Sequence, residues 1–380
     1  MKHDNRYIWF DFIRGLAALM VCAGHLRAVV MEEFTMISSP NVIDKALYFL
    51  TGLGHQAVVV FFVLSGFFVG GSVLRMKMQF NWSSYLVSRL SRLWVVLIPA
   101  LALTYLVDAF IASNYPEVLA GSLESVWHLG PVAGQYSNSI LTLLGNLFFM
   151  QGVFTSVFGT NGPLWSLANE FWYYMLFPLG LQAILALPSA RGTFSRFIAI
   201  GFIILIMFYM PIDMRYGLLI WLFGVVVYWA LATDLMVNQL WLVISATIFV
   251  MTLVYSKLQS GQLSDLLLGA SFSTLCIGLA KQRPPKFFHD AFIKLARSLS
   301  EFSYSLYLSH FPIVMLIGVC CYGRNRVATG ISGYSQFALW FLILLGTGGI
   351  FWWLFEKRTK VMRQILLKLI QTKLSKAVST

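Results

Sequence analysis

The first long apolar stretch of the chain contains two basic side chains at a spacing that suits chemistry across a membrane. Arg14 and His25 are eleven residues apart. That spacing is about 20° more than three full helical turns, so both would lie on one face about 16 Å apart along the axis. Asp11 can pair with Arg14 from three residues away. Ionisable residues in a span mark a functional site by default. The alternative is that His25 bonds a neighbouring helix while Arg14 reaches the interface.

A carboxylate in a later apolar stretch is expected near the depth of His25. Glu170 ends the sequence Leu-Trp-Ser-Leu-Ala-Asn-Glu at 164–170. If this span runs inward, Glu170 lies about 9 Å below its outer end. A carboxylate and an imidazole at one depth can form an acid–base pair, so we predict that Glu170 orients His25. The alternative is a glutamate that bonds a Tyr or Asn for helix packing.

Two other polar groups are predicted nearer the inner side. Arg89 and Arg92 share a helical face at the inner interface, where two guanidinium groups suit phosphates. Ordinary anchoring by positive inner loops explains them equally well. His310 shares a face with Ser303 and Tyr307 at the predicted depth of Arg14, and a packing interface is its alternative. The whole pattern fits a long anionic molecule that enters from the cytoplasm, as a reactant or as transported cargo.

The composition places these residues in a membrane protein. Hydrophobic residues make up 58% of the 380 residues and charged residues only 11%, against about 25% charged in a soluble domain. This excludes a soluble domain, a disordered chain and a disulfide scaffold. The apolar stretches are long and do not alternate, which excludes a lipid-facing β-barrel. We therefore predict an all-α polytopic membrane protein.

Loop charges predict about ten transmembrane helices with both termini in the cytoplasm. The expected spans are 8–29, 47–71, 93–112, 166–188, 196–211, 215–232, 239–256, 262–280, 303–321 and 335–356. Arg324 and Arg326 fall outside and run against the charge rule. If the apolar stretch at 140–152 also crossed the membrane, the loops that follow it would no longer fall on the sides that their charges predict. We therefore predict that it is re-entrant or lies along the interface.

The C-terminal end is expected to differ from the rest of the chain. Of the net charge of +12, seven units come from Lys and Arg after Glu356, where there is no acid. Apolar residues lie on the opposite face, so 357–380 is predicted to be a basic amphipathic cytoplasmic tail beyond a transmembrane domain at 1–356. No soluble module accompanies this charge, so we predict no nucleic-acid partner. The six His and four Cys show no ligand spacing, and no metal site is predicted.

Five motifs in order make the chain similar to the integral-membrane acyltransferase family 3, which includes bacterial polysaccharide O-acetyltransferases. They are the Arg and His at positions 14 and 25, Phe-Phe-x-Leu-Ser-Gly-Phe at 61–67, Arg-x-x-Arg at 89–92, Leu-Trp-Ser-Leu-x-x-Glu at 164–170 and Ser-Tyr-x-Leu-Tyr-Leu-x-His-x-Pro at 303–312. The chain departs from the family at Glu356, which precedes Lys357 and Arg358 where relatives often have Glu-x-Pro.

The resemblance implies a donor, an acceptor and roles for individual residues. The donor would be acetyl-CoA or another acyl-CoA in the cytoplasm, and the acceptor a hydroxyl on the outer side. His25 would be a general base or a transient acyl carrier. The candidate catalytic residues are His25, Glu170 and Arg14. The candidate donor-binding residues are Arg14, Arg89, Arg92 and His310. The candidate acceptor-binding residues are Trp165, Asn169 and Tyr307.

Two further candidates come from the loops and the helix turns. The predicted outer loop at 113–138 offers Trp127 and His128 for stacking on a sugar. Ser65 could donate to the thioester carbonyl, but close helix packing is the interpretation we favour.

The predicted function is a membrane O-acyltransferase of the bacterial cytoplasmic (inner) membrane. It would acetylate a surface glycan such as a lipid-linked O-antigen sugar of lipopolysaccharide. The acetyl group and the glycan rest on the resemblance alone, and another acyl group or a non-sugar acceptor would use the same residues. The alternative from another class is an exporter or flippase for a glycan or lipid, without acyl transfer.

Overall fold

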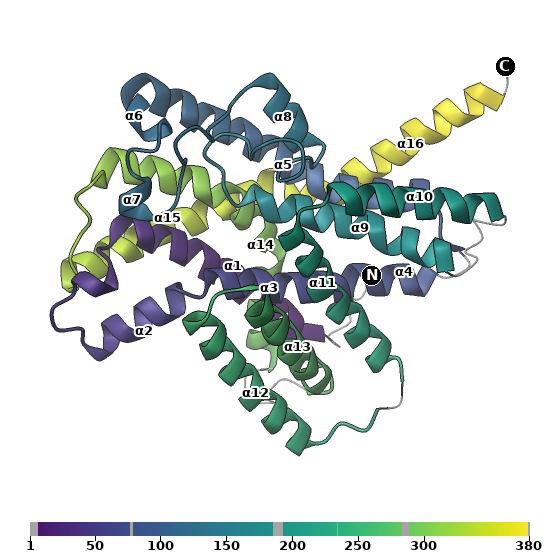
Figure 1. The fold of residues 1–380 in the computed structure, drawn as a ribbon, viewed down its shortest axis with the longest axis horizontal. Coiled ribbons are helices and arrows are strands. Elements are labelled where there is room, and N and C mark those ends of the chain that lie inside the picture. Colours follow the sequence, from purple (N-terminus) through teal and green to yellow (C-terminus); the bar gives the residue numbers. More distant parts are fainter. Residues whose placement is uncertain (1–6, 77–78, 185–192, 234, 283–288, 379–380) are drawn as a thin grey trace.

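The computed structural model describes residues 7–76, 79–184, 193–233, 235–282 and 289–378. Within these ranges the chain is helical, and its β-structure is limited to two isolated bridges. Figure 1 shows long helices that cross one another at the centre, with short helices and loops gathered at one end. The prediction of an all-α polytopic membrane protein is confirmed.

Eight helical segments in the described residues are long and apolar enough to cross a membrane. Two of them continue through a π-helical turn. α3 (Gly54–Ser65) passes through Gly66–Gly70 into α4 (Gly71–Met76), and α14 (His289–Ile317) is extended by Gly318–Tyr322. The other six contain α1 (Ile8–Val30), α5 (Trp82–Asn114), α11 (Ile212–Leu231), α12 (Gln239–Leu258), α13 (Gln262–Leu279) and α15 (Ile331–Leu354).

The two remaining predicted spans correspond to helices that are shorter or more polar. α9 (Leu164–Ile184) contains Asn169, Glu170 and several aromatic residues, which lower its hydropathy. α10 (Thr193–Tyr209) has 17 residues. The cytoplasmic position of both termini stays a prediction. So does a separate tail domain, whose residues form the 3-10 turn Glu356–Arg358 and α16 (Thr359–Val378).

The segment at 140–152 does not form a spanning helix, as the loop charges predict. It contains only α8 (Ile140–Leu147), and the following loop folds back onto α5. Buried Asp108 of α5 accepts hydrogen bonds from the Thr160 backbone N–H at 2.9 Å and from its hydroxyl at 2.7 Å. Buried Asn146 accepts from the backbone N–H of Phe158 at 3.0 Å. These bonds fix the loop that leads into α9.

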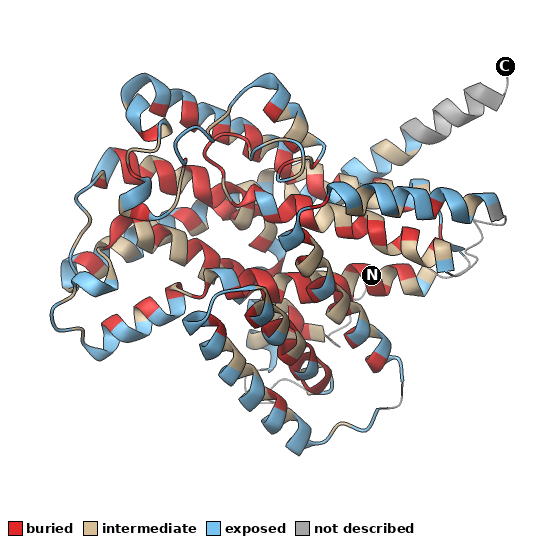
Figure 2. Ribbon diagram, viewed as in Figure 1, coloured by how far each residue is buried: buried red, intermediate tan, exposed pale blue. Residues whose placement is uncertain are grey.

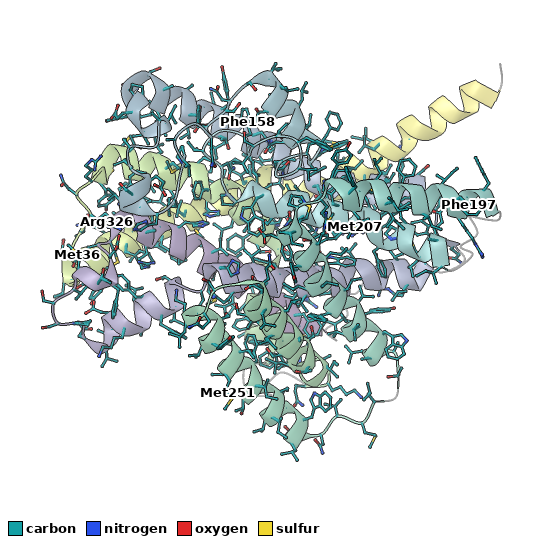
Figure 3. The ribbon with its side chains drawn as sticks, viewed as in Figure 1. Met36, Phe158, Phe197, Met207, Met251 and Arg326 are labelled. Carbon is teal, nitrogen blue, oxygen red and sulfur yellow. The ribbon has the colours of Figure 1, made fainter. Side chains whose placement is uncertain are left out.

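The helices divide into a buried centre and an exposed periphery. α1 packs against α3, α14 and α15, and Figure 2 shows buried residues concentrated on the central helices. α10 and α12 carry exposed apolar side chains, such as Phe197 and Met251, which point outward in Figure 3. Such surfaces suit contact with lipid, because acyl chains are as apolar as the side chains.

Two glycines bring the backbones of α11 and the α3 segment into contact. A Cβ on Gly66 would collide with the carbonyl oxygen of Trp221, and a Cβ on Gly224 with that of Val63. This approach lets the Trp221 indole N–H donate to the Ser65 hydroxyl at 3.1 Å. The glycine contact therefore fixes the position of a polar group inside the bundle.

We expect Gly224→Ala to destabilise the protein by about 1–3 kcal/mol, because the added methyl group must push two backbones apart. Gly349→Ala is the matched control, since a Cβ there meets open space. Thermal unfolding in detergent can be followed with a thiol-reactive dye that labels buried Cys22 and Cys276 as they become exposed. Equal unfolding temperatures for the two variants would contradict the close contact.

Candidate active site

A cavity of about 240 Å³, called the inner cavity because its arginines are predicted on the cytoplasmic side, is lined by all three predicted arginines. Arg14 comes from α1, and Arg89 and Arg92 come from α5. Glu170 of α9 is the carboxylate in the lining. Three guanidinium groups and one carboxylate give the cavity a positive potential, which favours an anionic ligand.

Some N–H groups of these arginines bond neighbouring residues, and others have no partner in the described part of the chain and are available to a ligand. Arg14 donates to Asp11 at 3.0 Å and to the Ser300 hydroxyl, and its guanidinium lies 5.4 Å from the centre of the Phe68 ring. The Nε atoms of Arg14 and Arg89 are buried without a partner among the described residues. Buried donors in folded proteins are normally paired. These atoms are therefore suited to bind the oxygens of a bound anion.

Glu170 belongs to the inner cavity and not to His25. Its carboxylate accepts hydrogen bonds from the Ser65 hydroxyl at 2.6 Å and from the Tyr174 hydroxyl. The predicted Glu170–His25 pair is therefore wrong. Similar depth brought the two residues together in the sequence argument, but the rotation of α9 turns Glu170 toward the α3 segment. The same bond corrects the prediction for Ser65, whose hydroxyl orients Glu170 in addition to its place in helix packing.

His25 instead pairs with His310. The Nδ1 of His25 lies 2.9 Å from the Nε2 of His310, and the two rings are parallel within 3°. The Nδ1 of wholly buried His310 faces the carbonyl oxygens of Leu306 at 3.0 Å and Tyr307 at 2.8 Å. His310 lines neither cavity described in this subsection. The structure therefore gives no support to donor binding by His310, which stays a prediction.

The hydrogen bonds of His310 determine which nitrogen of His25 is available. Carbonyl oxygens only accept, so the Nδ1 of His310 must carry a hydrogen. In a neutral imidazole the other nitrogen then accepts, so His310 Nε2 receives a hydrogen bond from His25 Nδ1–H. This leaves the lone pair on His25 Nε2, where it can take a proton or attack a carbonyl carbon.

An outer cavity of about 550 Å³ contains His25 and adjoins the inner cavity. Val58 and Tyr307 line both. At this junction of the two cavities the hydroxyl groups of Tyr307 and Ser166 form a hydrogen bond of 2.6 Å. Arg14 and His25 thus line two adjoining cavities and not one continuous pore. A ligand held by the arginines could reach His25 by passing Tyr307.

Of the three predicted acceptor-binding residues, two line a cavity and one does not. Trp165 is 40% exposed and lines the outer cavity, and Tyr307 lies at the junction. Asn169 is buried, bonds Tyr173 and lines neither cavity, so its predicted role is not supported. Trp127 is only 1% exposed and donates to the Gly323 carbonyl at 3.0 Å. Trp127 and its neighbour His128 both line the outer cavity, but burial leaves almost none of the Trp127 ring open for stacking on a sugar.

Glu356 is a polar residue of this region that the sequence argument did not assign. Its carboxylate accepts from the backbone N–H of Ser305 at 3.1 Å and from the Ser305 hydroxyl at 2.6 Å. It also interacts electrostatically with Arg92 and Arg14. The sequence does contain a signal for this role, because Glu356 is a single acidic residue at the start of a strongly basic tail. It offsets part of the positive charge around the inner cavity.

Comparisons with known proteins agree on one family. A family model described as "Acyltransferase domain" matches residues 7–357. The chain is 22% identical over 375 residues to the O-acetyl transferase of Shigella phage Sf6, covering 92% of this chain and 95% of that protein. It is 28% identical over 183 residues to the acyltransferase MdmB of Streptomyces mycarofaciens, covering 47% and 40% respectively. No solved structure gave a significant match.

We expect ¹⁵N NMR of histidine-labelled protein to show His25 and His310 with hydrogen on Nδ1 and a lone pair on Nε2. Six histidines allow assignment from single His→Ala variants. His310→Ala should release the fixed tautomer of His25, whereas His310→Gln should keep it because the amide oxygen can accept. His289→Ala, at an exposed histidine beside Asp290, is the control. Hydrogen on His25 Nε2 in the unchanged protein would contradict this arrangement.

Proposed function

The chain belongs to the acyltransferase family whose model covers residues 7–357, and from that premise we propose that it acetylates a glycan across a bacterial inner membrane. The acetyl group would come from acetyl-CoA in the cytoplasm and pass to a glycan hydroxyl on the outer side. The observation that carries the proposal is the pair of adjoining cavities, one lined by three arginines and the other by His25. The name of the phage relative, an O-acetyl transferase, supports the acetyl group.

The inner cavity is the proposed site for the donor. CoA carries several phosphate groups at one end and the thioester at the other. Arg14, Arg89 and Arg92 supply the guanidinium groups that pair well with phosphate oxygens. The unpartnered Nε atoms of Arg14 and Arg89 fit such a ligand. Glu170 and Glu356 limit the mutual repulsion of the arginines while no donor is bound.

His25 is the proposed catalytic base. Its Nε2 takes the proton from the acceptor hydroxyl as that oxygen attacks the thioester carbonyl carbon. The bond from carbon to sulfur then breaks, and the proton passes from His25 to the departing CoA sulfur. The same lone pair could attack the thioester first and form a transient acyl-histidine. In both routes His310 holds His25 in the required tautomer, which is the role of a positioning residue.

Replacing His25 is the direct test of this function. A host that makes the unchanged protein should add acetyl-sized mass to its surface glycan, and mild base should remove it. His25→Ala should reduce the modification by at least about 10²-fold, because a general base contributes about 10²–10⁴-fold. Mass spectrometry of the glycan at matched membrane abundance measures the effect.

His289→Ala is the control for that experiment and should leave the modification unchanged. A different added mass would replace acetyl by another acyl group. Equal modification with His25→Ala would exclude His25 as the catalyst. Changed glycan export with no modification in any variant would favour the exporter alternative.

The arginines are expected to act on donor binding. Arg92→Gln should raise the KM for acyl-CoA about tenfold or more, since one charge-assisted contact to phosphate is lost. Arg324→Gln is the matched control, because Arg324 is exposed, lines neither cavity and donates to the Ser122 carbonyl. The measurement is initial rate against acyl-CoA concentration with purified protein. An unchanged KM for Arg92→Gln would remove Arg92 from the donor site.

A further inference from the structure

The outer cavity contains more permanent positive charge than the residues around it neutralise. Arg27, Arg326 and Lys257 all line it, together with His25. Among the described residues in the lining, Glu33 supplies the carboxylate. Figure 3 labels Arg326 near the end of the molecule where α2 (Val42–Thr51) and α7 (Glu124–Trp127) lie. The charge therefore gathers at the predicted outer end of the bundle.

Glu33 is already engaged by two of its neighbours. Its Oε1 accepts from Arg326 at 3.2 Å and lies 2.9 Å from His128 Nε2. These hydrogen bonds, that of Arg326 foremost, hold the pKa of Glu33 below its usual value. Glu33 is thus a carboxylate at neutral pH, and its charge offsets that of Arg326. Asp265, nearby, is bound by His55 at 2.9 Å through both carboxylate oxygens.

Arg27 and Lys257 have no carboxylate within 4.0 Å among the described residues. The Arg27 guanidinium lies over the Tyr48 ring at 4.7 Å, and its buried Nε has no partner. Lys257 donates to the Gly52 carbonyl at 2.5 Å. The two cations are close enough to repel each other electrostatically. An anion between them would relieve that repulsion and satisfy open donors.

We infer that Arg27 and Lys257 bind an oxyanion of the acceptor, either a carboxylate of an acidic sugar or a phosphate attached to the glycan. The inference rests on the proposed function and names the class of acceptor. Arg27 follows His25 by two residues on α1, a rise of about 3 Å. Residues two apart point to different faces of a helix, but Arg27 and His25 both line the outer cavity, so the anion and the hydroxyl that reacts at His25 would share that cavity. Trp165, on the wall of the same cavity, offers an aromatic face to the sugar ring.

The test compares three probes on detergent-purified full-length protein: glucuronate, glucose 1-phosphate and the uncharged methyl glucoside. Saturation-transfer NMR gives the dissociation constant of each. We expect at least one charged probe to bind about tenfold or more tightly than methyl glucoside, with a preference that weakens as salt is added. The tighter of the two charged probes identifies carboxylate or phosphate as the source of the anion.

Charge-removing variants separate this site from the rest of the surface. Arg27→Gln and Lys257→Gln should each reduce the preference for the charged probe about tenfold. Lys281→Gln is the matched control for Lys257, because Lys281 also donates to a backbone carbonyl yet lines neither cavity. Arg324→Gln is the matched control for Arg27. Equal binding of all three probes, or a preference that survives both cavity variants, would overturn the inference.

Failure of this inference and failure of the proposed function give different results. Binding of acyl-CoA by Arg27→Gln should equal that of the unchanged protein, because the proposed donor cavity is a different one. His25→Ala should lose transfer but keep the preference for charged probes. If His25→Ala lost that preference while its thermal unfolding showed a folded protein, the proposed anion site at Arg27 and Lys257 would also be overturned. Retained transfer in His25→Ala would instead refute only the proposed mechanism.

Discussion

Three guanidinium groups line a cavity between apolar helices, where charge costs free energy, and several polar residues inside this bundle offset that cost. Asp11 and Ser300 hold Arg14, while Glu170 and Glu356 supply negative charge near Arg14 and Arg92. The positions of α1, α5 and α9, and of the end of α15, are coupled through these contacts. A cavity that is positive but not fully neutralised is the result, and it is suited to a polyanionic ligand.

The histidine pair is kept apart from those charges. His25 contacts His310, and His310 contacts backbone carbonyls, whereas Asp11, Glu170 and Glu356 lie near the arginines of the inner cavity. A carboxylate beside His25 would favour its protonated form, which has no lone pair for proton transfer. Neutral His310 fixes the ring without adding charge. Separation of donor binding from proton transfer therefore follows from which residues face each cavity.

The periphery of the molecule obeys a different constraint. α10 and α12 expose apolar side chains, which suits helices in contact with lipid, and of their residues Lys257 at the end of α12 reaches the outer cavity. α9 is more polar than an ordinary span because it carries Glu170, Ser166 and Trp165 toward the two cavities. The loop before it is anchored by buried Asp108 and Asn146. That anchor sets where α9 begins and therefore where Glu170 and Trp165 lie.

The sequence by itself determined the fold class, the family and several of the residues that line the cavities, such as Arg14, Arg89, Arg92 and His25. Long apolar stretches and costly buried charges are properties of the chain alone. Only the tertiary structure decided the partners: His25 with His310, Glu170 with Ser65 and Tyr174, and Asn169 in packing. Helical periodicity gives depth and face within one helix. The rotation of each helix against its neighbours depends on packing contacts, such as those at Gly66 and Gly224, between residues far apart in the chain.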